Sequence, residues 1–277
     1  FKAALIQMRS GVDMARNLSD ASAMIREAAG RGAQYVLTPE MTNIFEADRE
    51  RLKSLVRLEE QDASVAGFSR LAQELGIRLH VGSLALRASE DRLVNRSLLF
   101  APDGALVARY DKIHLFDVDM PSGERIRESD TFAPGNEAVV TRLPWGPLGL
   151  SICYDMRFPN LYNTLANAGA MFMAVPAAFT VPTGKAHWHV LLRSRAIETG
   201  SFVFAAAQGG AHECGRHTFG HSLVVTPWGE IVAELETEPG VLVFDVDEEL
   251  VKRDRGLIPA LKNARAFNLK LTGGMVI

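Results

Sequence analysis

The stretch "LGLSICYDMRFPN", residues 148–160, predicts a β-strand that ends at a cysteine and leads into a helix. Its first six residues form the short apolar run of a buried strand, and Pro159 and Asn160 are typical of a helix start. A residue at such a turn is exposed, and the next backbone N–H can point at a developing oxyanion. Cys153 is therefore a candidate nucleophile, and the N–H of Tyr154 is a candidate oxyanion donor. The alternative, a buried structural cysteine, is commoner for an arbitrary cysteine.

The rest of the chain alternates in the same way between strand-like and helix-like segments. Apolar spacing predicts helices near residues 15–30, 61–76, 159–169 and 186–199. An Asp-Gly pair at 103–104, between two apolar runs, predicts a hairpin. Crossovers and hairpins together predict mixed sheets with helices packed outside, an α/β fold. No linker rich in Ser, Gly or Pro divides the chain, so we expect a single domain over residues 1–277, with an irregular loop at 121–134.

Composition limits the classes of function. The chain is 47% hydrophobic and 23% charged, with a formal net charge of −3, which is ordinary for a soluble globular protein. Because no block of Lys and Arg occurs, we expect neither a nucleic-acid partner nor a membrane partner. The longest apolar stretch, residues 171–179, is too short to span a bilayer. The two cysteines, Cys153 and Cys214, argue against a disulfide scaffold and lead us to expect a cytoplasmic protein.

Two charged residues also end predicted strands. Glu40 follows "YVLTP" directly, and Lys112 ends "LVARYDK". In α/β sheets, binding sites collect beyond the carboxyl ends of strands. One cleft could therefore hold both side chains beside Cys153, since a thiol nucleophile needs a base and a positive charge nearby. Taken singly, each charge is better explained as a solvated strand end.

Histidines cluster in the C-terminal half, at positions 187, 189, 212, 217 and 221. The pairs His187/His189 and His217/His221 have spacings that metal ligands use, so a metal hydrolase is an alternative to consider. We connect no carboxylate or second thiol with these pairs, and therefore expect no metal site. The histidines are then hydrogen-bonding residues of loops and helices.

The chain resembles the nitrilase superfamily, the carbon–nitrogen hydrolases that use a Glu–Lys–Cys triad. The resemblance runs from "AALIQM" near the start to "GLIPALKNARAFNL" near the end. It rests on "TPE" (38–40), "YDKIHLFD" (110–117), "RESDTFAPG" (127–135), "GLSICYDMRFP" (149–159), "AHWHVLLRSRAIET" (186–199) and "FGHSLVVTPWGEIVAE" (219–234). The forms "CYDMRFP" and "RAIET" are similar to those of the deaminated-glutathione amidase and omega-amidase branch. Asp111 departs from the pattern, which usually has Arg before the catalytic Lys.

The resemblance implies a role for each matching residue. Cys153 would be the nucleophile, Glu40 the general base, and Lys112 the oxyanion donor together with the N–H of Tyr154. Glu128 would support Lys112 and touch the substrate. The implied fold is an α-β-β-α sandwich with two mixed sheets between helix layers, and such subunits pair as homodimers or larger homo-oligomers. The resemblance implies no metal or organic cofactor.

The implied substrate is a small-molecule amide that carries a carboxylate. Deaminated glutathione or a 2-oxo dicarboxylic acid monoamide would be hydrolysed to acid and ammonia through a Cys thioester. Arg157, Phe179 and Thr199 are the candidate substrate-binding residues. The alternatives are an N-carbamoyl amino acid or amine hydrolase with the same triad, and a catalytically silent binding protein on the same fold. We also expect the Lys112 ammonium to lower the pKa of the Cys153 thiol.

Overall fold

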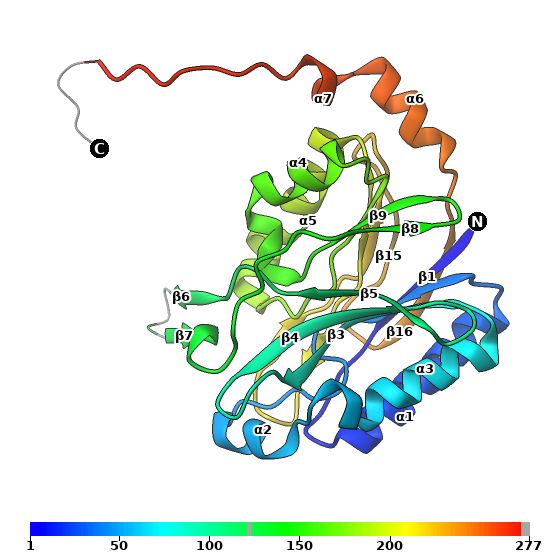
Figure 1. Cartoon of the computed structure of the whole chain (residues 1–277), viewed down its shortest axis with the longest axis vertical. Helices are drawn as coiled ribbons and strands as arrows, with labels where there is room; N and C mark the ends of the chain where they lie inside the picture. Colours follow the sequence, from blue (N-terminus) through cyan, green and yellow to red (C-terminus); the bar gives the residue numbers. More distant parts are fainter. Residues whose placement is uncertain (121–122, 124, 273–277) are drawn as a thin grey trace.

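The computed structural model describes residues 1–120, 123 and 125–272. At its centre are two six-stranded sheets that face each other, with helices outside (Figure 1). In spatial order, the first sheet contains β16 (Gly240–Asp245), β1 (Lys2–Gln7), β2 (Tyr35–Leu37), β3 (Arg78–Arg87), β4 (Leu93–Phe100) and β5 (Leu106–Asp111). The second sheet contains β15 (Ile231–Glu234), β14 (Leu223–Val225), β11 (Phe202–Ala205), β10 (Phe172–Ala174), β9 (Gly146–Leu150) and β8 (Val140–Leu143). The predicted α/β class is confirmed.

Each sheet has three parallel strands that helical crossovers connect. In the first sheet β1, β2 and β3 are parallel, joined by α1 (Met14–Gly30) and by α3 (Ala63–Leu75). In the second sheet β9, β10 and β11 are parallel, joined by α4 (Pro159–Asn167) and α5 (Val181–Thr199). The outer strands pair antiparallel. Both sheets are therefore mixed, as predicted.

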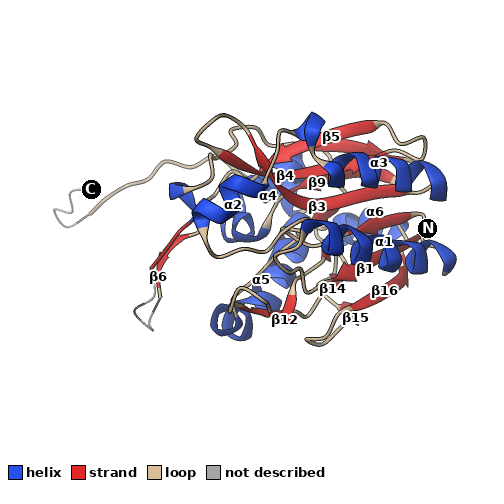
Figure 2. Ribbon diagram, turned by 90° about the horizontal axis from the view of Figure 1, so that it is seen from below, coloured by secondary structure: helices blue, strands red, loops and turns tan. Residues whose placement is uncertain are grey.

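Four layers result, with α1 and α3 on the outer face of the first sheet and α4 and α5 on the outer face of the second (Figures 1 and 2). β1 shows how the sequence produces them. Ala4 and Ile6 pack into the core beneath α1 and α3, whereas Ala3 and Leu5 pack into the core between the sheets. Because successive strand residues point to opposite faces, a strand buried on both faces must be apolar throughout.

Three of the four predicted helices agree closely with α1, α3 and α4. The fourth, α5, begins earlier than predicted, at Val181, because Pro182 lies in its first turn, where a fixed φ and a missing N–H are harmless. The short helices α2 (Arg49–Leu55), α6 (Glu249–Leu257) and α7 (Ala260–Asn263) were not predicted. α2 and α7 have too few turns for a detectable period, and α6 is mostly charged, with only Val251 and Asp254 buried. Within the described ranges, no helix combines the length and the apolar character that a membrane span needs.

The segment 121–134 holds more structure than the predicted loop. β7 (Arg125–Arg127) pairs antiparallel with β6 (Asp117–Asp119), and a 3-10 helix, η2 (Glu128–Asp130), follows. Residues 121, 122 and 124 of the predicted loop lie outside the described residues. A further small hairpin pairs β12 (Gly209–Ala211) with β13 (His217–Phe219).

The C-terminal segment leaves the layered body. After α7, residues 264–272 run outwards without helix or strand (Figures 1 and 2). Phe267 exposes 90% of its surface there.

Candidate active site

The candidate catalytic residues lie just beyond the ends of strands from both sheets. Glu40 comes three residues after β2, Lys112 directly follows β5, and Cys153 comes three residues after β9. The strands β2 and β9 are thus shorter than the sequence indicated. After β2 comes Pro39, which has no N–H to donate to a neighbouring strand. Glu40, Lys112, Cys153 and Glu128 all line one pocket.

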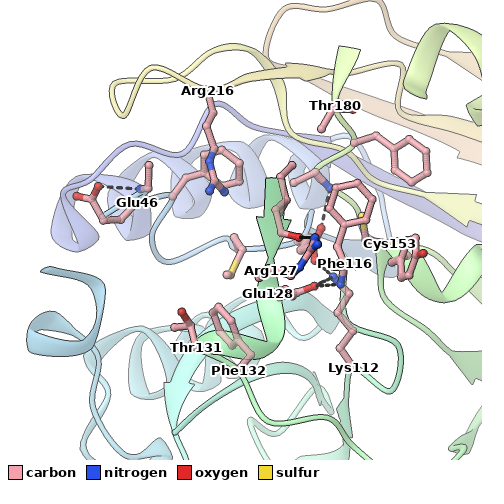
Figure 3. A pocket seen from close by; sticks show the side chains of 18 of the residues that line it. Glu46, Lys112, Phe116, Arg127, Glu128, Thr131, Phe132, Cys153, Thr180 and Arg216 are labelled. Atoms are coloured by element: carbon pink, nitrogen blue, oxygen red, sulfur yellow. Dashed lines mark hydrogen bonds and ion pairs between the residues drawn. The ribbon is translucent and has the colours of Figure 1, made fainter. Parts of the chain in front are cut away.

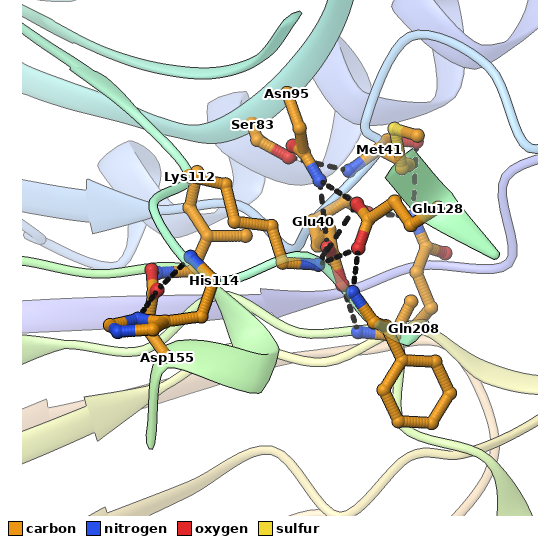
Figure 4. Close-up of polar contacts among 12 residues, drawn as sticks. Glu40, Met41, Ser83, Asn95, Lys112, His114, Glu128, Asp155 and Gln208 are labelled. Carbon is orange, nitrogen blue, oxygen red and sulfur yellow. Dashed lines mark hydrogen bonds and ion pairs between the residues drawn. The ribbon is translucent and has the colours of Figure 1, made fainter. Parts of the chain in front are cut away.

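The ammonium of Lys112 lies between two carboxylates (Figure 4). Its Nζ is 2.9 Å from Glu40 Oε1 and 2.9 Å from Glu128 Oε2. Lys112 and Glu40 are buried, so solvent screens their attraction little. Burial by itself lowers the pKa of Lys112, but the negative charges of Glu128 and Glu40 outweigh burial and hold that pKa well above its usual range. The site therefore contains a permanent positive charge.

Neutral donors orient both carboxylates. Asn95 Nδ2 donates to Glu40 Oε1 at 2.8 Å and to Glu128 Oε1 at 3.3 Å. The N–H of Ala178 donates to Glu40 Oε2 at 2.9 Å, and the N–H of Phe116 donates to Glu128 Oε2 at 2.6 Å. Hydrogen bonds to ionised acceptors are the stronger kind. Each carboxylate is therefore held in one orientation toward Lys112.

The turn that carries Glu40 packs tightly against β3. A Cβ on Gly82 would lie 2.0 Å from the carbonyl oxygen of Thr38, so only glycine allows this approach. Met41, the residue after Glu40, has a φ of 57°, and its N–H donates to Ser83 Oγ at 2.9 Å. β3 thus fixes the position of Glu40 from behind.

Cys153 begins a 3-10 helix, η3 (Cys153–Arg157), in a left-handed backbone conformation with a φ of 49°. Such a conformation costs a non-glycine residue about 1–3 kcal/mol and persists where the surroundings enforce it. The N–H of Cys153 donates to the carbonyl of Pro176 at 2.9 Å. The N–H of Tyr154 has no hydrogen-bond partner in the described part of the chain, and Tyr154 lines the pocket. This N–H is therefore available to an oxyanion.

Asp155 connects the cysteine turn to the segment around Lys112. Its Oδ2 accepts from the N–H of Ile152 at 2.8 Å and from the Tyr110 hydroxyl at 2.6 Å. Its Oδ1 accepts from the N–H of His114 at 3.0 Å and lies 2.7 Å from His114 Nδ1 (Figure 4). Tyr110 and His114 stand two residues before and after Lys112. One buried carboxylate thus positions the thiol and the ammonium relative to each other.

The Cys153 thiol has a raised pKa. Burial raises it, and the negative charge of Glu40 raises it further. Lys112 and a backbone hydrogen bond from Ala178 act in the opposite direction, yet the pKa lies well above its usual range. Lys112 therefore lowers the thiol pKa as expected, but the net pKa is raised, because desolvation and the charge of Glu40 exceed the effect of the ammonium. The resting group is a neutral thiol, which needs a base before it can attack.

The pocket in front of Cys153 has a volume of about 190 Å³ (Figure 3). Aromatic rings and arginines contribute much of its wall. The lining includes the rings of Phe45, Phe116, Phe132 and Phe179 and the guanidinium groups of Arg127 and Arg216. The pocket can hold a small polar molecule against the thiol.

The predicted substrate-binding residues lie in different places. Phe179 lines the pocket. The guanidinium of Arg157 lies outside the pocket lining, 5.8 Å from the ring centroid of Tyr154 and 5.3 Å from that of Phe179. Thr199 is buried in the last turn of α5, where its hydroxyl donates to the carbonyl of Arg195, and it does not line this pocket.

The structure brings together two of the clustered histidines and a carboxylate that the sequence analysis did not connect with them. His189 Nε2 and His221 Nδ1 lie 2.8 Å and 2.7 Å from the same atom, Glu234 Oε1. These three residues are not part of the lining of the Cys153 pocket. His187 contacts Arg157 instead, at 3.3 Å.

Three further functional candidates were not predicted from the sequence, namely Asn95, Asp155 and Arg216. Asn95 interrupts the apolar strand β4, and a buried polar side chain needs partners, so its position was a usable signal. Asp155 lies inside the "CYDMRFP" motif, but its partners are distant in sequence. Arg216 reaches the pocket only through the tertiary fold, so no local pattern indicates it.

Comparison with known proteins shows the family of this chain. Residues 2–255 match the family described as carbon–nitrogen hydrolase. The deaminated glutathione amidase of Yersinia enterocolitica is 38% identical over 265 residues, which cover 95% of this chain and 92% of that protein. The omega-amidase NIT2 of Xenopus tropicalis is 34% identical over 271 residues, which cover 96% of this chain and 95% of that protein.

Solved structures share the fold. The C. elegans NitFhit protein matches with a TM-score of 0.89 and 34% identity over 95% of this chain, and this chain spans 65% of NitFhit. An amidase mutant from Nesterenkonia sp. AN1, described as showing Michael addition of acrylamide at the active site cysteine, has a TM-score of 0.78 and 28% identity, with 94% and 98% of the two chains covered. The chain thus belongs to the carbon–nitrogen hydrolase family of the nitrilase superfamily and is a hydrolase that acts on carbon–nitrogen bonds.

Proposed function

We propose that this amidase hydrolyses a small carboxylate-bearing amide to an acid and ammonia through a thioester on Cys153. The observation that carries the proposal is the buried Glu40–Lys112 ion pair, which shares one pocket with the neutral Cys153 thiol. A carboxylate can remove the thiol proton, and an ammonium can stabilise the oxyanion that follows. The cysteine adduct of the Nesterenkonia amidase supports Cys153 as the nucleophile.

In the first half of the reaction, Cys153 Sγ bonds to the amide carbonyl carbon while Glu40 takes the thiol proton. The negative charge that develops on the carbonyl oxygen is stabilised by the Lys112 ammonium and the N–H of Tyr154. One such donor is typically worth about 3 kcal/mol of transition-state stabilisation. When the carbon–nitrogen bond breaks, Glu40 gives its proton to the leaving nitrogen and ammonia departs. A thioester remains on Cys153.

In the second half, Glu40 takes a proton from water as the water oxygen bonds to the thioester carbon. The carbon–sulfur bond then breaks, Glu40 gives this proton to the Cys153 sulfur, and the acid leaves. Glu128 keeps Lys112 charged throughout, because its carboxylate is one of the charges that raise the pKa of Lys112. Atoms and charges balance with these side chains and water, so the proposal requires no metal or organic cofactor.

For the substrate we propose deaminated glutathione or a 2-oxo dicarboxylic acid monoamide, from the names of the relatives. Both molecules carry a carboxylate, and several arginines line the pocket. Arg49 pairs with Asp130 and Arg127 pairs with Asp119. The guanidinium of Arg216 has no hydrogen-bond or ion-pair partner within the described ranges, and Figure 3 shows it across the pocket from Lys112. Arg216 is therefore our candidate for the substrate carboxylate, with Phe179 as part of the wall.

The test is ammonia release from deaminated glutathione, 2-oxoglutaramate, glutamine, a simple nitrile and a carbamoyl amino acid. We expect the first two to be the best substrates. Arg216→Gln should raise the KM for them by about tenfold or more, the value of one hydrogen bond to a charged group, with little change in kcat. The control is Arg142→Gln, at an exposed arginine that does not line the pocket. Equal rates for glutamine, or equal KM values for the two variants, would contradict this substrate class.

The same measurement separates the alternatives. An N-carbamoyl amino acid or amine hydrolase would release carbon dioxide together with ammonia from the carbamoyl compound. A catalytically silent binding protein would release no ammonia and show no acyl adduct on Cys153 by intact mass.

We further propose that residues 1–277 form one domain and that two copies form a homodimer. Pairing of the first strand, β1, with the last, β16, supports the single domain. The dimer is supported by exposed apolar side chains on α5, with Val190 and Ile197 65% and 54% exposed, and by the outward C-terminal segment with Phe267. A second copy could cover both. A cytoplasmic location remains our proposal, and the two free cysteines suit a reducing compartment.

A further inference from the structure

A second cluster of functional side chains lies outside the amidase pocket, where α5 meets the edge of the second sheet. His189 lies on α5, His221 lies just before β14, and Glu234 ends β15. Nε2 of His189, Nδ1 of His221 and a carboxylate oxygen of Glu234 all lie within 4.8 Å of one another. Both ring nitrogens approach the same oxygen, Glu234 Oε1, at 2.8 Å and 2.7 Å.

Packing holds both imidazole rings in place. The ring of Phe219 stacks on His221, with centroids 4.2 Å apart, and lies edge-on to His189, with centroids 6.1 Å apart. Phe219 itself is pressed against α5 at Gly184, where a Cβ would lie 2.2 Å from its ring. Trp188 Nε1 donates to the carbonyl of His221 at 2.8 Å. Because the rings are already oriented, a ligand bound between them would cost little additional side-chain entropy.

The cluster is partly exposed to solvent, and both of its imidazole rings can change tautomer. The side chains of His189, His221 and Glu234 are 34%, 26% and 31% exposed. In the described part of the chain, His189 Nδ1 and His221 Nε2 have no hydrogen-bond partner. A neutral imidazole carries one N–H, so its proton can move to this outer nitrogen when the inner nitrogen binds a cation. Both rings then stay neutral, as metal ligation requires.

We propose that His189, His221 and Glu234 form a Zn²⁺ site, with water in the fourth position. Two imidazoles and a carboxylate are a ligand set that zinc uses, whereas Mg²⁺ and Ca²⁺ prefer oxygen ligands. Tetrahedral zinc with bonds of about 2.0 Å needs donor atoms about 3.3 Å apart, so each ring nitrogen must move away from Glu234 Oε1 by only about 0.5 Å. The bound ion ties α5 to the edge strand β15. This site is separate from the amide chemistry and does not depend on the proposed substrate.

The test measures Zn²⁺ binding to tag-free protein in a Cys153→Ala/Cys214→Ser background, so that neither thiol can act as a ligand. Isothermal titration calorimetry should give one saturable site per chain. His189→Asn and Glu234→Gln should each weaken the affinity by at least about tenfold, since even outer-shell losses cost 10–100-fold. Zn²⁺ should raise the Tm of the background protein but not that of His189→Asn. Co²⁺ bound at the site should show the visible absorption of a four-coordinate ion.

The matched control is His217→Asn, because His217 is an exposed histidine of the same region that does not belong to the cluster. It should bind Zn²⁺ like the background protein. Tm values without metal show whether each variant folds, and Glu234→Gln supplies a second readout if His189→Asn is unstable. Absence of saturable binding, or equal affinity in His189→Asn, Glu234→Gln and His217→Asn, would mean that the three side chains form only a hydrogen-bonded group.

Discussion

Asp155 Oδ2 accepts a 2.6 Å hydrogen bond from the hydroxyl of Tyr110, and this bond joins the two halves of the candidate active site. Asp155 belongs to the turn that presents Cys153, and Tyr110 lies on β5 just before Lys112. Cys153, the proposed nucleophile, and the ammonium of Lys112 follow strands of different sheets, so the distance between them depends on this buried contact. Without this hydrogen bond, the end of β5 would be less firmly held relative to the turn after β9.

Asp155→Asn should therefore impair both stability and turnover. The amide cannot accept at both oxygen positions, and its NH₂ group would face donors. Loss of hydrogen bonds to a charged acceptor should lower the free energy of unfolding by about 2–4 kcal/mol. The value of kcat should fall by about tenfold or more, because the thiol and the ammonium would no longer be held in the right geometry. Urea unfolding and steady-state kinetics measure the two effects. Tyr110→Phe removes one donor only and should cost about 1.5 kcal/mol; an equal loss in both variants would disagree with this role.

Cys153→Ala should fold normally and lose turnover by about 10⁴-fold or more, because it removes the attacking atom. Glu40→Gln should also lose turnover, since the neutral thiol then has no base. Ammonia release measures activity, and circular dichroism checks the fold. Cys214→Ser, the matched change at the other cysteine, should keep activity near that of the unchanged protein. Substantial activity in Cys153→Ala would end the thioester mechanism.

Gly82→Ala should displace Glu40 although Glu40 itself is unchanged. The new Cβ would lie 2.0 Å from the carbonyl oxygen of Thr38, so the turn that carries Glu40 must shift. Overpacking of this kind costs about 1–3 kcal/mol, and we expect kcat to fall as well. The control is Gly30→Ala, where no atom lies within 4 Å of the added Cβ; helix stability there should stay the same or rise by about 0.4–1 kcal/mol. Unchanged kcat in Gly82→Ala would show that this close approach does not position the base.

Stability should fall as the solution becomes acidic, partly because of His80. Burial lowers the pKa of the His80 imidazole from 6.5 to about 3. The unfolded chain therefore binds this proton first, so the contribution is complete above pH 6.5 and is lost as the pH falls toward 3. The expected loss is about 1.4 kcal/mol per pH unit below 6.5, or about 2 kcal/mol at pH 5.

Urea unfolding at pH 7 and pH 5 measures this loss. His80→Gln should show a smaller difference between the two pH values than the unchanged protein. His80 bonds to the Tyr35 hydroxyl and Ser97 Oγ, so the variant will also be less stable at pH 7. An identical pH dependence in both proteins would assign the acid sensitivity to other groups.

The proposed homodimer predicts different outcomes at two exposed apolar positions. Ile197→Glu on α5 should weaken the dimer, because it places a charge in an apolar contact. Val107→Glu on β5, at a side chain that is exposed to a similar extent, should not. Sedimentation velocity at several protein concentrations distinguishes dimer from monomer. A monomer in the unchanged protein, or equal behaviour of the two variants, would reject the dimer through α5.

The local patterns predicted the alternation of elements well. The spacing of apolar residues located α1, α3 and α4, because each helix buries one stripe on a sheet. Turn chemistry placed Cys153 between a strand and a helix. The same patterns missed α2, which is too short for a clear period, and α6, which is mostly charged and has too few apolar residues to form a stripe. They also predicted longer strands before Glu40 and Cys153 than the structure has. A strand ends where its ladder partners end, and those partners are remote in sequence.

The sequence by itself determined which residues could react and that each stands near the end of a strand. Chemistry of this kind is local, since it depends on residue type and on the turn that presents it. Only the tertiary structure decided that Glu40, Lys112 and Glu128 meet, that burial raises rather than lowers the pKa of Cys153, and that Arg216 reaches the pocket while Thr199 does not. Those outcomes depend on distances between strands of two sheets and on the exclusion of water, which no single segment specifies.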